Sequence, residues 1–464
     1  MNKIRLSGLH HEEMKKHLFP GDGKEAVGIA LCGRSNYNGN YTLLVKEFHP
    51  IPYEVCFERR EDFVHWPTEF INPLLEKASK KGLAILKIHC HPTGFNQFSK
   101  IDNESDNALF ASIHSWLDDS LPHASCVMLP DGRMFGRFFN EDIKETSVHH
   151  IAVAGSDLLN WYYTEDDTTI EATSQIRNEQ AFGKKTVKLL NRLKVGIVGC
   201  SGTGSPVIEQ LKRLGVGEFV LVDPDYIDSV NLNRIVGSTI NHTTNKTMKV
   251  DVMAEGIELL GIGTKVKSFA YNIVNESIIK ELADCDVLFG CVDSAEGRHV
   301  LNLISSYYLV PLIDLGVKFE ADGKGGIEGI FGSVHYIQPF GSSLISRKQY
   351  SPEQLVGDQV KRIDNEEYER NQYLAKANES NPAVISVNVQ IAGIAVNELL
   401  ARLHPYRNFD NSEVDVVKVS FADCTTFPER FTDQCAYFSK FSGSGDISPL
   451  LNYTEFTINV KENI

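Results

Sequence analysis

The sequence predicts an α/β protein of two domains, the second of which contains a doubly wound parallel sheet. After about residue 175 the pattern becomes repeated strand and helix units, which is typical of parallel sheets covered by helices. In one of these units, at residues 193–214, an apolar strand runs through a glycine-rich turn directly into a helix. A polar, acidic segment at residues 164–174 has almost no large apolar residues and precedes this region.

Length and composition are those of a globular protein with more than one core. The chain has 464 residues, which is too long for one compact core. Its content of 42% hydrophobic and 23% charged residues is ordinary for a globular chain. We expect a first domain over residues 1–150, a linker over residues 151–175 and a second domain over residues 176–464.

Charge and hydropathy exclude some classes of partner. The net charge of -15 disfavours nonspecific attraction to nucleic acid. No run is long and apolar enough to cross a bilayer, and the amino terminus lacks a signal-like apolar core, so a cytoplasmic location is expected. The nine cysteines include no Cys-x-x-Cys pair, which argues against both a disulfide framework and a four-cysteine zinc site.

A short motif in the first domain contains three potential metal ligands. Residues 83–88 form an apolar run typical of a buried strand, and His89 and His91 follow it. Side chains at positions i and i+2 of a strand point the same way, so both imidazoles can reach one ion. Asp102, delivered by the following turn, completes a three-ligand set. Such a set leaves a fourth coordination position open, as a hydrolytic zinc site requires.

A hydrolytic site also needs a general base, and an upstream carboxylate is the candidate. Glu25 follows a turn and opens the strand-like run at residues 26–31. The alternative for the whole motif is a pair of structural histidines beside an ordinary helix cap formed by Ser99 and Asp102.

These residues resemble the signature of the JAMM (JAB/MPN-plus) metalloprotease family. That signature is a remote Glu followed by His-x-His-Pro, six residues, Ser, two residues and Asp, and every position is filled here. The resemblance implies an α/β/α metalloprotease domain with Zn2+ held by His89, His91 and Asp102. It also implies that Glu25 is the general acid/base and that Ser99 stabilises the oxyanion.

The second domain contains a glycine-rich loop at a helix amino terminus. The strand at residues 193–198 runs into this loop, which contains Gly199, Gly202 and Gly204. Backbone amides there can hold phosphate, and the helix dipole favours its negative charge. Many nucleotide-binding folds share this pattern, including nicotinamide-dependent dehydrogenases.

Acidic and amide residues follow the next strand. The strand at residues 218–222 ends before Asp223 and Asp225, where an acid can bind ribose hydroxyls. Asn231, Asn233 and Arg234 come soon afterwards, and such a cluster supplies charge-assisted contacts to a triphosphate rather than to nicotinamide. Residues from about 175 to 403 resemble the ThiF/MoeB family and the adenylation domain of ubiquitin-activating enzymes, which are Rossmann-like.

That resemblance implies roles for further residues. Arg177 matches an arginine that reaches the ATP phosphates, often from the other subunit of a dimer. Lys249 matches an ATP-binding lysine, and Asp293, followed by Ser294, matches a magnesium-associated aspartate. Each residue also has a structural alternative: Asp293 as a helix cap, Lys249 as a solvated charge and Arg298, one turn beyond, as a surface ion-pair partner.

The residue that would accept an activated acyl group is open. Ubiquitin-activating enzymes place a cysteine in the crossover region, but residues 331–381 contain none. The enzyme could stop at the acyl-adenylate, pass the acyl group to another protein, or use a later cysteine, Cys424 or Cys435. A serine oxyester is a further alternative, at Ser342, Ser343, Ser346 or Ser351.

Together the two resemblances imply a bifunctional enzyme of a prokaryotic ubiquitin-like conjugation system, some of which are associated with defence against phage. One half would process a ubiquitin-like protein with Zn2+, and the other would adenylate its C-terminal glycine with ATP and Mg2+. The expected partners are that ubiquitin-like protein, a ubiquitin-conjugating-enzyme-like protein and a second copy in a homodimer. The alternatives are a nucleotide-binding scaffold or sensor with only the protease active, and activation of a sulfur carrier in cofactor biosynthesis.

Overall fold

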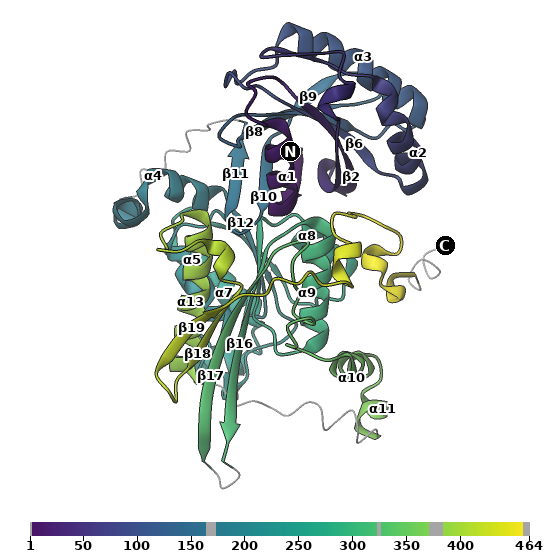
Figure 1. Cartoon of the computed structure of the whole chain (residues 1–464). Helices are drawn as coiled ribbons and strands as arrows, with labels where there is room; N and C mark the ends of the chain where they lie inside the picture. The colour runs from purple at the N-terminus through teal and green to yellow at the C-terminus, as the bar shows by residue number, and fades with distance from the viewer. Residues whose placement is uncertain (1, 164–172, 323–325, 371–383, 458–464) are drawn as a thin grey trace. The chain divides into compact units, whose positions relative to one another are not determined.

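The computed structural model describes residues 2–163, 173–322, 326–370 and 384–457. The chain divides into two compact units, whose elements are labelled in Figure 1. Unit 1 comprises Met1–Thr168, Tyr307–Leu309 and Phe441–Ile464, and unit 2 comprises Thr169–Ser306 and Val310–Lys440.

Unit 1 is built on a mixed nine-stranded sheet with the strand order β11-β10-β1-β3-β2-β6-β7-β8-β9. Its strands are β1 (Lys3–Ser7), β2 (Val27–Tyr37), β3 (Asn40–Pro50), β6 (Ala84–Cys90), β7 (His123–Met128), β8 (Met134–Phe139), β9 (Glu145–Ser147), β10 (His150–Ala154) and β11 (Leu158–Tyr162). A separate two-stranded ribbon and the α-helices complete this unit: β4 (Glu58–Arg60), β5 (Phe63–His65), α1 (Gly8–Leu18), α2 (Asn72–Lys81) and α3 (Lys100–Leu117).

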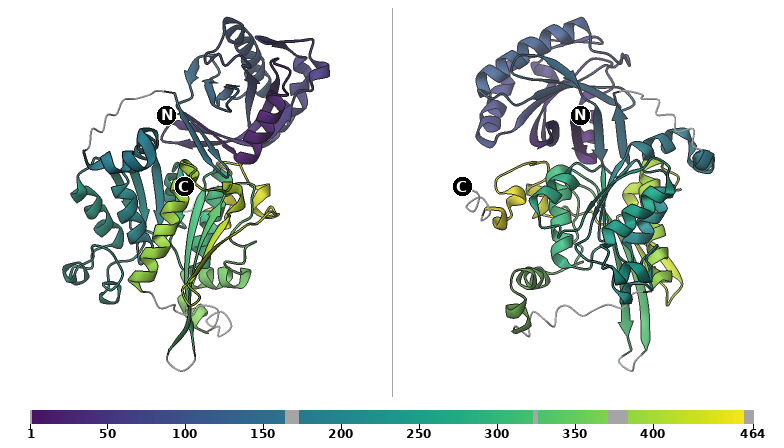
Figure 2. Two further views of the ribbon diagram at one scale, coloured as in Figure 1. Left: turned by 60° about the vertical axis from the view of Figure 1, so that its left-hand side comes forward. Right: turned by 180° about the vertical axis from the view of Figure 1, so that it is seen from behind.

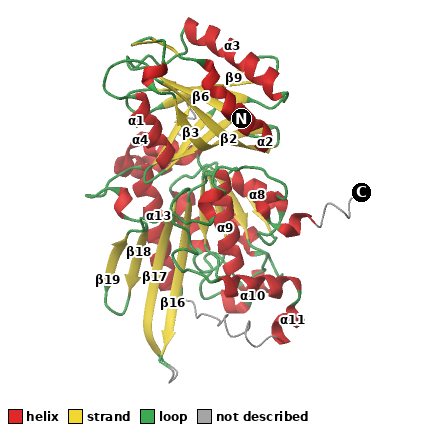
Figure 3. Ribbon diagram, turned by 45° about the vertical axis from the view of Figure 1, so that its right-hand side comes forward, coloured by secondary structure: helices red, strands yellow, loops and turns green. Residues whose placement is uncertain are grey.

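The helices of unit 1 cover both faces of its sheet. Along β2, Ala30 packs in a cluster that contains Met14 of α1, whereas Ile29 packs in a cluster that contains Phe110 of α3. Because successive strand residues point to opposite faces, α1 and α3 lie on opposite faces of the sheet. Both helices are labelled in Figure 3. The predicted α/β/α layering is therefore present in this unit.

The first unit extends further along the chain than the sequence predicts. The predicted linker over 151–175 begins within the sheet, because β10 pairs with β1 and β11 pairs with β10. β11 is a half-buried edge strand, and the composition changes only after it, so the boundary is hidden in the sequence. Residues 164–172, which hold most of the polar, acidic segment at residues 164–174, lie outside the described residues.

The predicted second domain, 176–464, also includes residues that belong with unit 1. The described part of Phe441–Ile464 contacts β2, where the Asp446 carboxylate accepts hydrogen bonds from the Ser35 hydroxyl (3.4 Å) and the Asn36 amide (2.8 Å). These contacts join residues 410 positions apart in the chain, and no local pattern predicts such a return.

Unit 2 is built on an eight-stranded sheet with the order β14-β13-β12-β15-β16-β17-β18-β19. Its strands are β12 (Lys194–Val198), β13 (Glu218–Val222), β14 (Lys265–Phe269), β15 (Val287–Gly290), β16 (Leu312–Ala321), β17 (Ile327–Ile337), β18 (Val416–Ser420) and β19 (Thr425–Glu429). Its α-helices are α4 (Ile176–Arg192), α5 (Gly204–Arg213), α6 (Ile240–Thr244), α7 (Lys249–Leu260), α8 (Glu276–Ala283), α9 (Ala295–Tyr308), α10 (Pro352–Ile363), α11 (Asn365–Arg370) and α13 (Ile385–Leu403).

The parallel part of this sheet confirms the predicted doubly wound fold. Strands β12 to β16 are parallel, and β12 pairs on one side with β13 and on the other with β15. The strand order therefore reverses between β12 and β15, which is the switch point where open α/β sheets bind ligands. From β16 onward the sheet is antiparallel, and β16 and β17 form a long ribbon, seen from two further sides in Figure 2.

Helix α13 (Ile385–Leu403) is strongly apolar. It packs on α5 and on the strands β16 and β17, with Ile391 and Leu399 fully buried. Among the helices that the structure describes, none is long and apolar enough to cross a membrane.

Candidate functional site

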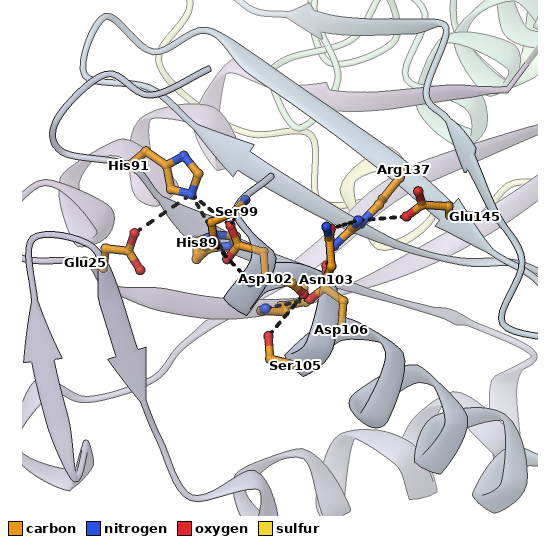
Figure 4. Close-up of polar contacts among 11 residues, drawn as sticks. Glu25, His89, His91, Ser99, Asp102, Asn103, Ser105, Asp106, Arg137 and Glu145 are labelled. Atoms are coloured by element: carbon orange, nitrogen blue, oxygen red, sulfur yellow. Dashed lines mark hydrogen bonds and ion pairs between the residues drawn. The ribbon is translucent and has the colours of Figure 1, made fainter. Parts of the chain in front are cut away.

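The predicted metal ligands of unit 1 converge at one point (Figure 4). The Nε2 atoms of His89 and His91 lie 3.2 Å apart. The Asp102 carboxylate contacts both rings, with 3.0 Å from Oδ1 to His89 Nε2 and 3.4 Å from Oδ2 to His91 Nε2. All three side chains are buried. The structure therefore brings the histidines and the aspartate together as predicted.

Local structure explains how each ligand is delivered. His89 lies near the end of β6, and the His91 amide donates to the Met128 carbonyl at the end of the neighbouring β7 (3.1 Å). Asp102 lies in the first turn of α3, where Ser99 is the N-cap. The Ser99 hydroxyl accepts from the Asp102 amide (3.1 Å), and the Ser99 amide donates to the Asp102 carboxylate (2.7 Å). This capping box fixes the carboxylate beside the histidines.

Glu25 lies at the edge of the same cluster. Its carboxylate is 3.9 Å from His91 Nε2, and only 5% of the residue is exposed. Burial raises the pKa of Glu25 to about 8, against the opposing charge effect of His91. The Glu25 backbone is held by the β4–β5 ribbon, because its amide donates to the Arg60 carbonyl (2.7 Å) and its carbonyl accepts from Arg59 Nε (2.8 Å).

The donor set fits a zinc ion. His91 Nδ1 lies 2.6 Å from the Phe95 carbonyl, which places the ring proton on Nδ1 and leaves the Nε2 lone pair directed at the cluster. His89 also presents Nε2, and its Nδ1 has no hydrogen-bond partner among the described residues. Two imidazole nitrogens and one carboxylate match a hydrolytic zinc site with an open position. Glu25 lies within reach of the two histidines and is an alternative third ligand.

A second group of charged residues, which the sequence did not indicate, lies behind these ligands. Lys87 of β6, Asp106 of α3 and Arg137 of β8 form ion pairs, with 2.6 Å from Lys87 Nζ and 2.8 Å from Arg137 Nη2 to the Asp106 carboxylate. All three residues are at least 95% buried. In the sequence, the only signal is that Lys87 interrupts an otherwise apolar strand.

Another cluster of unit 1 has the residue types of a metal site, but its hydrogen bonds do not leave the ligand atoms free to coordinate an ion. His114, Asp119 and His123 lie close together. His123 Nδ1 accepts from the Ile85 amide (2.9 Å), so the ring proton lies on Nε2 and blocks coordination there. Arg34 Nη2 is 3.5 Å from the same Nε2 and 3.3 Å from the Asp119 carboxylate, and its positive charge opposes a bound cation. This cluster is a structural one.

In unit 2 the predicted glycine loop lies at the switch point of the sheet, between β12 and α5. Gly199 has φ = +92°, a conformation that strongly favours glycine. A Cβ atom on Gly204 would lie 1.8 Å from the Gly199 carbonyl oxygen, and one on Gly202 would lie 2.4 Å from Asn388 Nδ2. The chain is therefore tightly folded here, and Asn388 of α13 is a loop neighbour that sequence analysis did not assign. In the sequence, Asn388 is recognisable only as an amide residue within an apolar helix, and the structure shows that its side chain is buried.

The two predicted acids after β13 have different environments. Asp223 is 5% exposed and accepts hydrogen bonds from the amides of Cys200 (2.7 Å) and Asp225 (3.0 Å), so it holds the glycine loop to β13. Asp225 has an exposed carboxylate that pairs with Lys249 Nζ at 2.6 Å. Lys249 also lies 3.7 Å from Asp223. Of the two carboxylates, that of Asp225 is therefore the more accessible.

The Asn and Arg cluster lies near the same loop. Asn231 is buried and caps the short 3-10 helix at Ser229–Asn231, where its Oδ1 accepts from the Asp228 amide (3.1 Å). Asn233 is exposed and accepts from Arg234 Nη1 (3.1 Å). Arg234 lies beside Gly202, since its Cδ would be 3.2 Å from a Cβ built there. The Cδ atom of Arg234 is therefore close to the predicted phosphate loop, and Nη1 also donates to the Val230 carbonyl (2.7 Å).

Asp293 and Ser294 lie after β15, whose end is adjacent to the end of β12. Asp293 is exposed, and Ser294 Oγ accepts from the Gly297 amide in the first turn of α9 (3.1 Å). The first amides of α9 donate to the Asp358 carboxylate of α10, with 2.6 Å from Ala295 N. The sequence did not indicate this contact, because α10 follows α9 by more than forty residues.

Arg177 is not joined to the predicted nucleotide residues. It lies on α4, is exposed and donates to Gln180 Oε1 (3.0 Å). No hydrogen bond or ion pair connects it to the glycine loop or Lys249 within the described part of the chain.

The candidate acyl acceptors are unequal in access. Ser342 and Cys435 are buried, and Ser342 Oγ accepts from Arg347 Nε (2.9 Å). Ser343 and Ser346 hydrogen-bond each other, and Ser351 caps α10. Cys424 is exposed in the turn between β18 and β19. Of the two cysteines, only Cys424 is accessible.

These features define unit 2 as a nucleotide-binding α/β domain, and comparison with known proteins gives its family. The model of the ThiF family matches residues 173–435, which is more than half of the chain. The chain therefore belongs to the ThiF family. The cluster of histidines and carboxylates in unit 1 lies outside the match.

Curated relatives match only part of this region. Adenylyltransferase and sulfurtransferase UBA4 of Meyerozyma guilliermondii is 27% identical over 31% of this chain and 33% of its own length. Ubiquitin-like modifier-activating enzyme 5 of Drosophila willistoni is 23% identical over 33% of this chain and 38% of its own. SAMP-activating enzyme E1 of Haloferax volcanii is 29% identical over 27% of this chain and 47% of its own. The chain thus spans less than half the length of each of these relatives.

Proposed function

We propose that unit 2 adenylates the C-terminal carboxylate of a ubiquitin-like protein with ATP and Mg2+. The residues that support the proposal lie at one edge of the sheet: the glycine loop, Lys249, Asp225 and Arg234. Cations offset the charge of a triphosphate, and loop amides can hold its phosphates. The three relatives are named as an adenylyltransferase and two activating enzymes, which favours the same reaction class.

We propose further that unit 1 is a zinc-dependent peptidase of the JAMM type. The observation that carries this proposal is the convergence of two histidine nitrogens, the Asp102 carboxylate and a buried Glu25 in one cluster. Zinc in such a donor set supplies Lewis acidity, which polarises a carbonyl group and acidifies water.

Three residues of the chain supply the proton transfer, the oxyanion contact and the ligand orientation in this proposal. Glu25 is the carboxylate beside the proposed ligands that can take a proton from water and return it to a leaving amine, and its burial raises its affinity for that proton. Ser99 keeps a free hydroxyl proton while its oxygen caps α3, and this proton can be donated to an oxyanion. His91 is held in the required tautomer by the Phe95 carbonyl.

Both reactions act on the same group in this proposal, the C-terminus of a ubiquitin-like protein. Peptide or isopeptide cleavage at that terminus exposes a carboxylate, and adenylation activates it. We propose that a ubiquitin-conjugating-enzyme-like protein receives the acyl group. In the same proposal, the chain forms a homodimer in which the exposed Arg177 reaches the nucleotide of the second copy.

A second candidate function is activation of a sulfur carrier. The name of the Meyerozyma guilliermondii relative combines adenylyl and sulfur transfer. In this candidate function, a sulfur nucleophile would attack the adenylate. A co-purified small protein that ends in a thiocarboxylate would favour this function over conjugation.

Two variants test the division of labour. His91→Ala is expected to abolish cleavage of an extended ubiquitin-like protein and to leave ATP–pyrophosphate exchange intact. Asp293→Ala is expected to abolish exchange while the purified chain still holds about one zinc ion by elemental analysis. If both activities fell together in either variant with the fold preserved, two independent sites would be ruled out.

A further inference from the structure

We infer that the buried trio of Lys87, Asp106 and Arg137 positions the candidate metal ligands by fixing helix α3 against strand β6. The inference rests on the proposed peptidase function of unit 1. It assigns these residues a positioning role, since no hydrogen bond or ion pair joins them to the predicted ligands within the described part of the chain.

The spacing of the residues supports this role. Lys87 precedes His89 by two residues on β6, and Asp106 follows Asp102 by four residues on α3. Side chains at these spacings share a face in a strand and in a helix, respectively. The Lys87–Asp106 ion pair (2.6 Å) therefore runs beside the His89–Asp102 contact (3.0 Å) and joins the same two elements. Any movement that separates Asp102 from the histidines would also break this buried pair.

Arg137 extends the same connection to a third strand. From β8, its Nη2 donates to Asp106 (2.8 Å) and its Nη1 donates to Asn103 in the first turn of α3 (2.5 Å). The guanidinium carbon also lies 3.8 Å from the centre of the Phe98 ring, next to the N-cap residue Ser99. Arg137 thus holds both the loop that precedes α3 and its first turn.

Burial distinguishes this trio from ordinary surface ion pairs. Asp106 is 0% exposed, and Lys87 and Arg137 are each 5% exposed. Buried ion pairs give little net stability because desolvation offsets their attraction, but their geometry is specific. Three such charges directly behind a candidate metal site are therefore better suited to setting a distance than to stabilising the fold.

The test uses the full chain without metal, prepared as wild type, K87M and D106N. K87M removes the ammonium group and keeps a chain of similar length, while Asp106 retains Arg137 as its partner. D106N keeps the shape of the side chain. K77M is the matched control, because Lys77 on α2 also forms an ion pair, with Glu47 at 2.5 Å, but lies away from the cluster. The dissociation constant for Zn2+ is measured by competition with a chromogenic chelator, and the visible spectrum of the Co2+ form reports ligand geometry.

The inference predicts that K87M and D106N bind Zn2+ about 10-fold or more weakly, the low end for outer-shell partners of metal ligands. Their Co2+ spectra should change, while K77M should match the wild type. Unchanged Zn2+ affinity in variants that melt like the wild type would overturn the inference. So would failure of both variants to fold, which would show a role in stability alone. If the wild type itself binds no Zn2+, the proposed peptidase function fails instead.

Discussion

Glu25 and Asp102 are both within reach of the two histidines, but they have different roles in the proposed mechanism. Asp102 touches both rings at 3.0 and 3.4 Å and is fixed by the Ser99 capping box. The Glu25 carboxylate lies farther away, at 3.9 Å from His91 Nε2, and burial raises its pKa. In the proposed mechanism, Asp102 is therefore the ligand and Glu25 is the general base.

The conservative variant Glu25→Gln separates these roles. The amide cannot take up a proton, so kcat for cleavage is expected to fall by about 10²- to 10⁴-fold. Zinc content, measured by elemental analysis, should remain that of the wild type, whereas Asp102→Asn should lower it. Zinc loss in E25Q with normal zinc in D102N would reverse the assignment.

The convergence of the candidate metal ligands could be predicted because these residues lie within a short motif. Three ligands and one hydroxyl occupy fourteen positions, and only Glu25 is remote. The trio of Lys87, Asp106 and Arg137 could not be predicted, because a charged residue in a sequence is usually a solvated one. Pairing across a strand, a helix and a second strand becomes visible only in three dimensions.

At the scale of elements, the glycine loop of unit 2 leaves no room for a side chain at Gly204. Gly199 and Gly204 approach each other so closely that a Cβ on Gly204 would overlap the Gly199 carbonyl. This loop follows β12, which lies at the switch point of the sheet. Displacing it would move the amides away from the position where phosphate is expected to bind.

Gly204→Ala is therefore expected to abolish ATP–pyrophosphate exchange and to leave cleavage by unit 1 unchanged. Gly256 on α7 provides the control, since a Cβ there meets only Lys212 Nζ at 3.4 Å. G256A should retain exchange and gain about 0.5–1 kcal/mol of unfolding free energy, because alanine is favoured in helix interiors. Normal exchange by G204A would show that the loop does not hold the nucleotide.

Elements with strong local signals were predicted, and those defined by remote pairing were not. The β12–α5 unit is present as expected. By contrast, β10 and β11 extend the sheet of unit 1 into the predicted linker, because strand pairing at an edge leaves little trace in composition. The ThiF match shows the family of unit 2, whereas the peptidase function of unit 1 stays a prediction.

For the whole molecule, buried neutral histidines in both units make stability depend on pH. Burial lowers the pKa of His10 in unit 1 to about 4 and that of His299 in unit 2 to about 4. Below the unfolded pKa of about 6.5, the unfolded chain takes up protons that the folded units do not bind. Stability is therefore fully present above that pH and is lost as pH falls toward 4.

Each of these histidines is expected to cost about 2 kcal/mol of unfolding free energy at pH 5 relative to neutral pH. Chemical unfolding of the full chain at pH 7.5 and pH 5 measures the loss. H299Q should reduce the acid sensitivity of unit 2, and H65Q, which replaces an exposed histidine of β5, should not change it. Equal stability at the two pH values would show that the buried rings are protonated in the folded state.

In the proposed function, one chain both activates and processes the same C-terminus. The first experiment is ATP–pyrophosphate exchange by the wild-type chain, measured with candidate small proteins that end in glycine and with the same proteins carrying a C-terminal extension. We expect immediate exchange with the glycine-ended form of one partner, and exchange with its extended form only after Zn2+-dependent cleavage. Cleavage without exchange for every candidate would contradict the proposed function and would leave unit 2 as a nucleotide-binding scaffold.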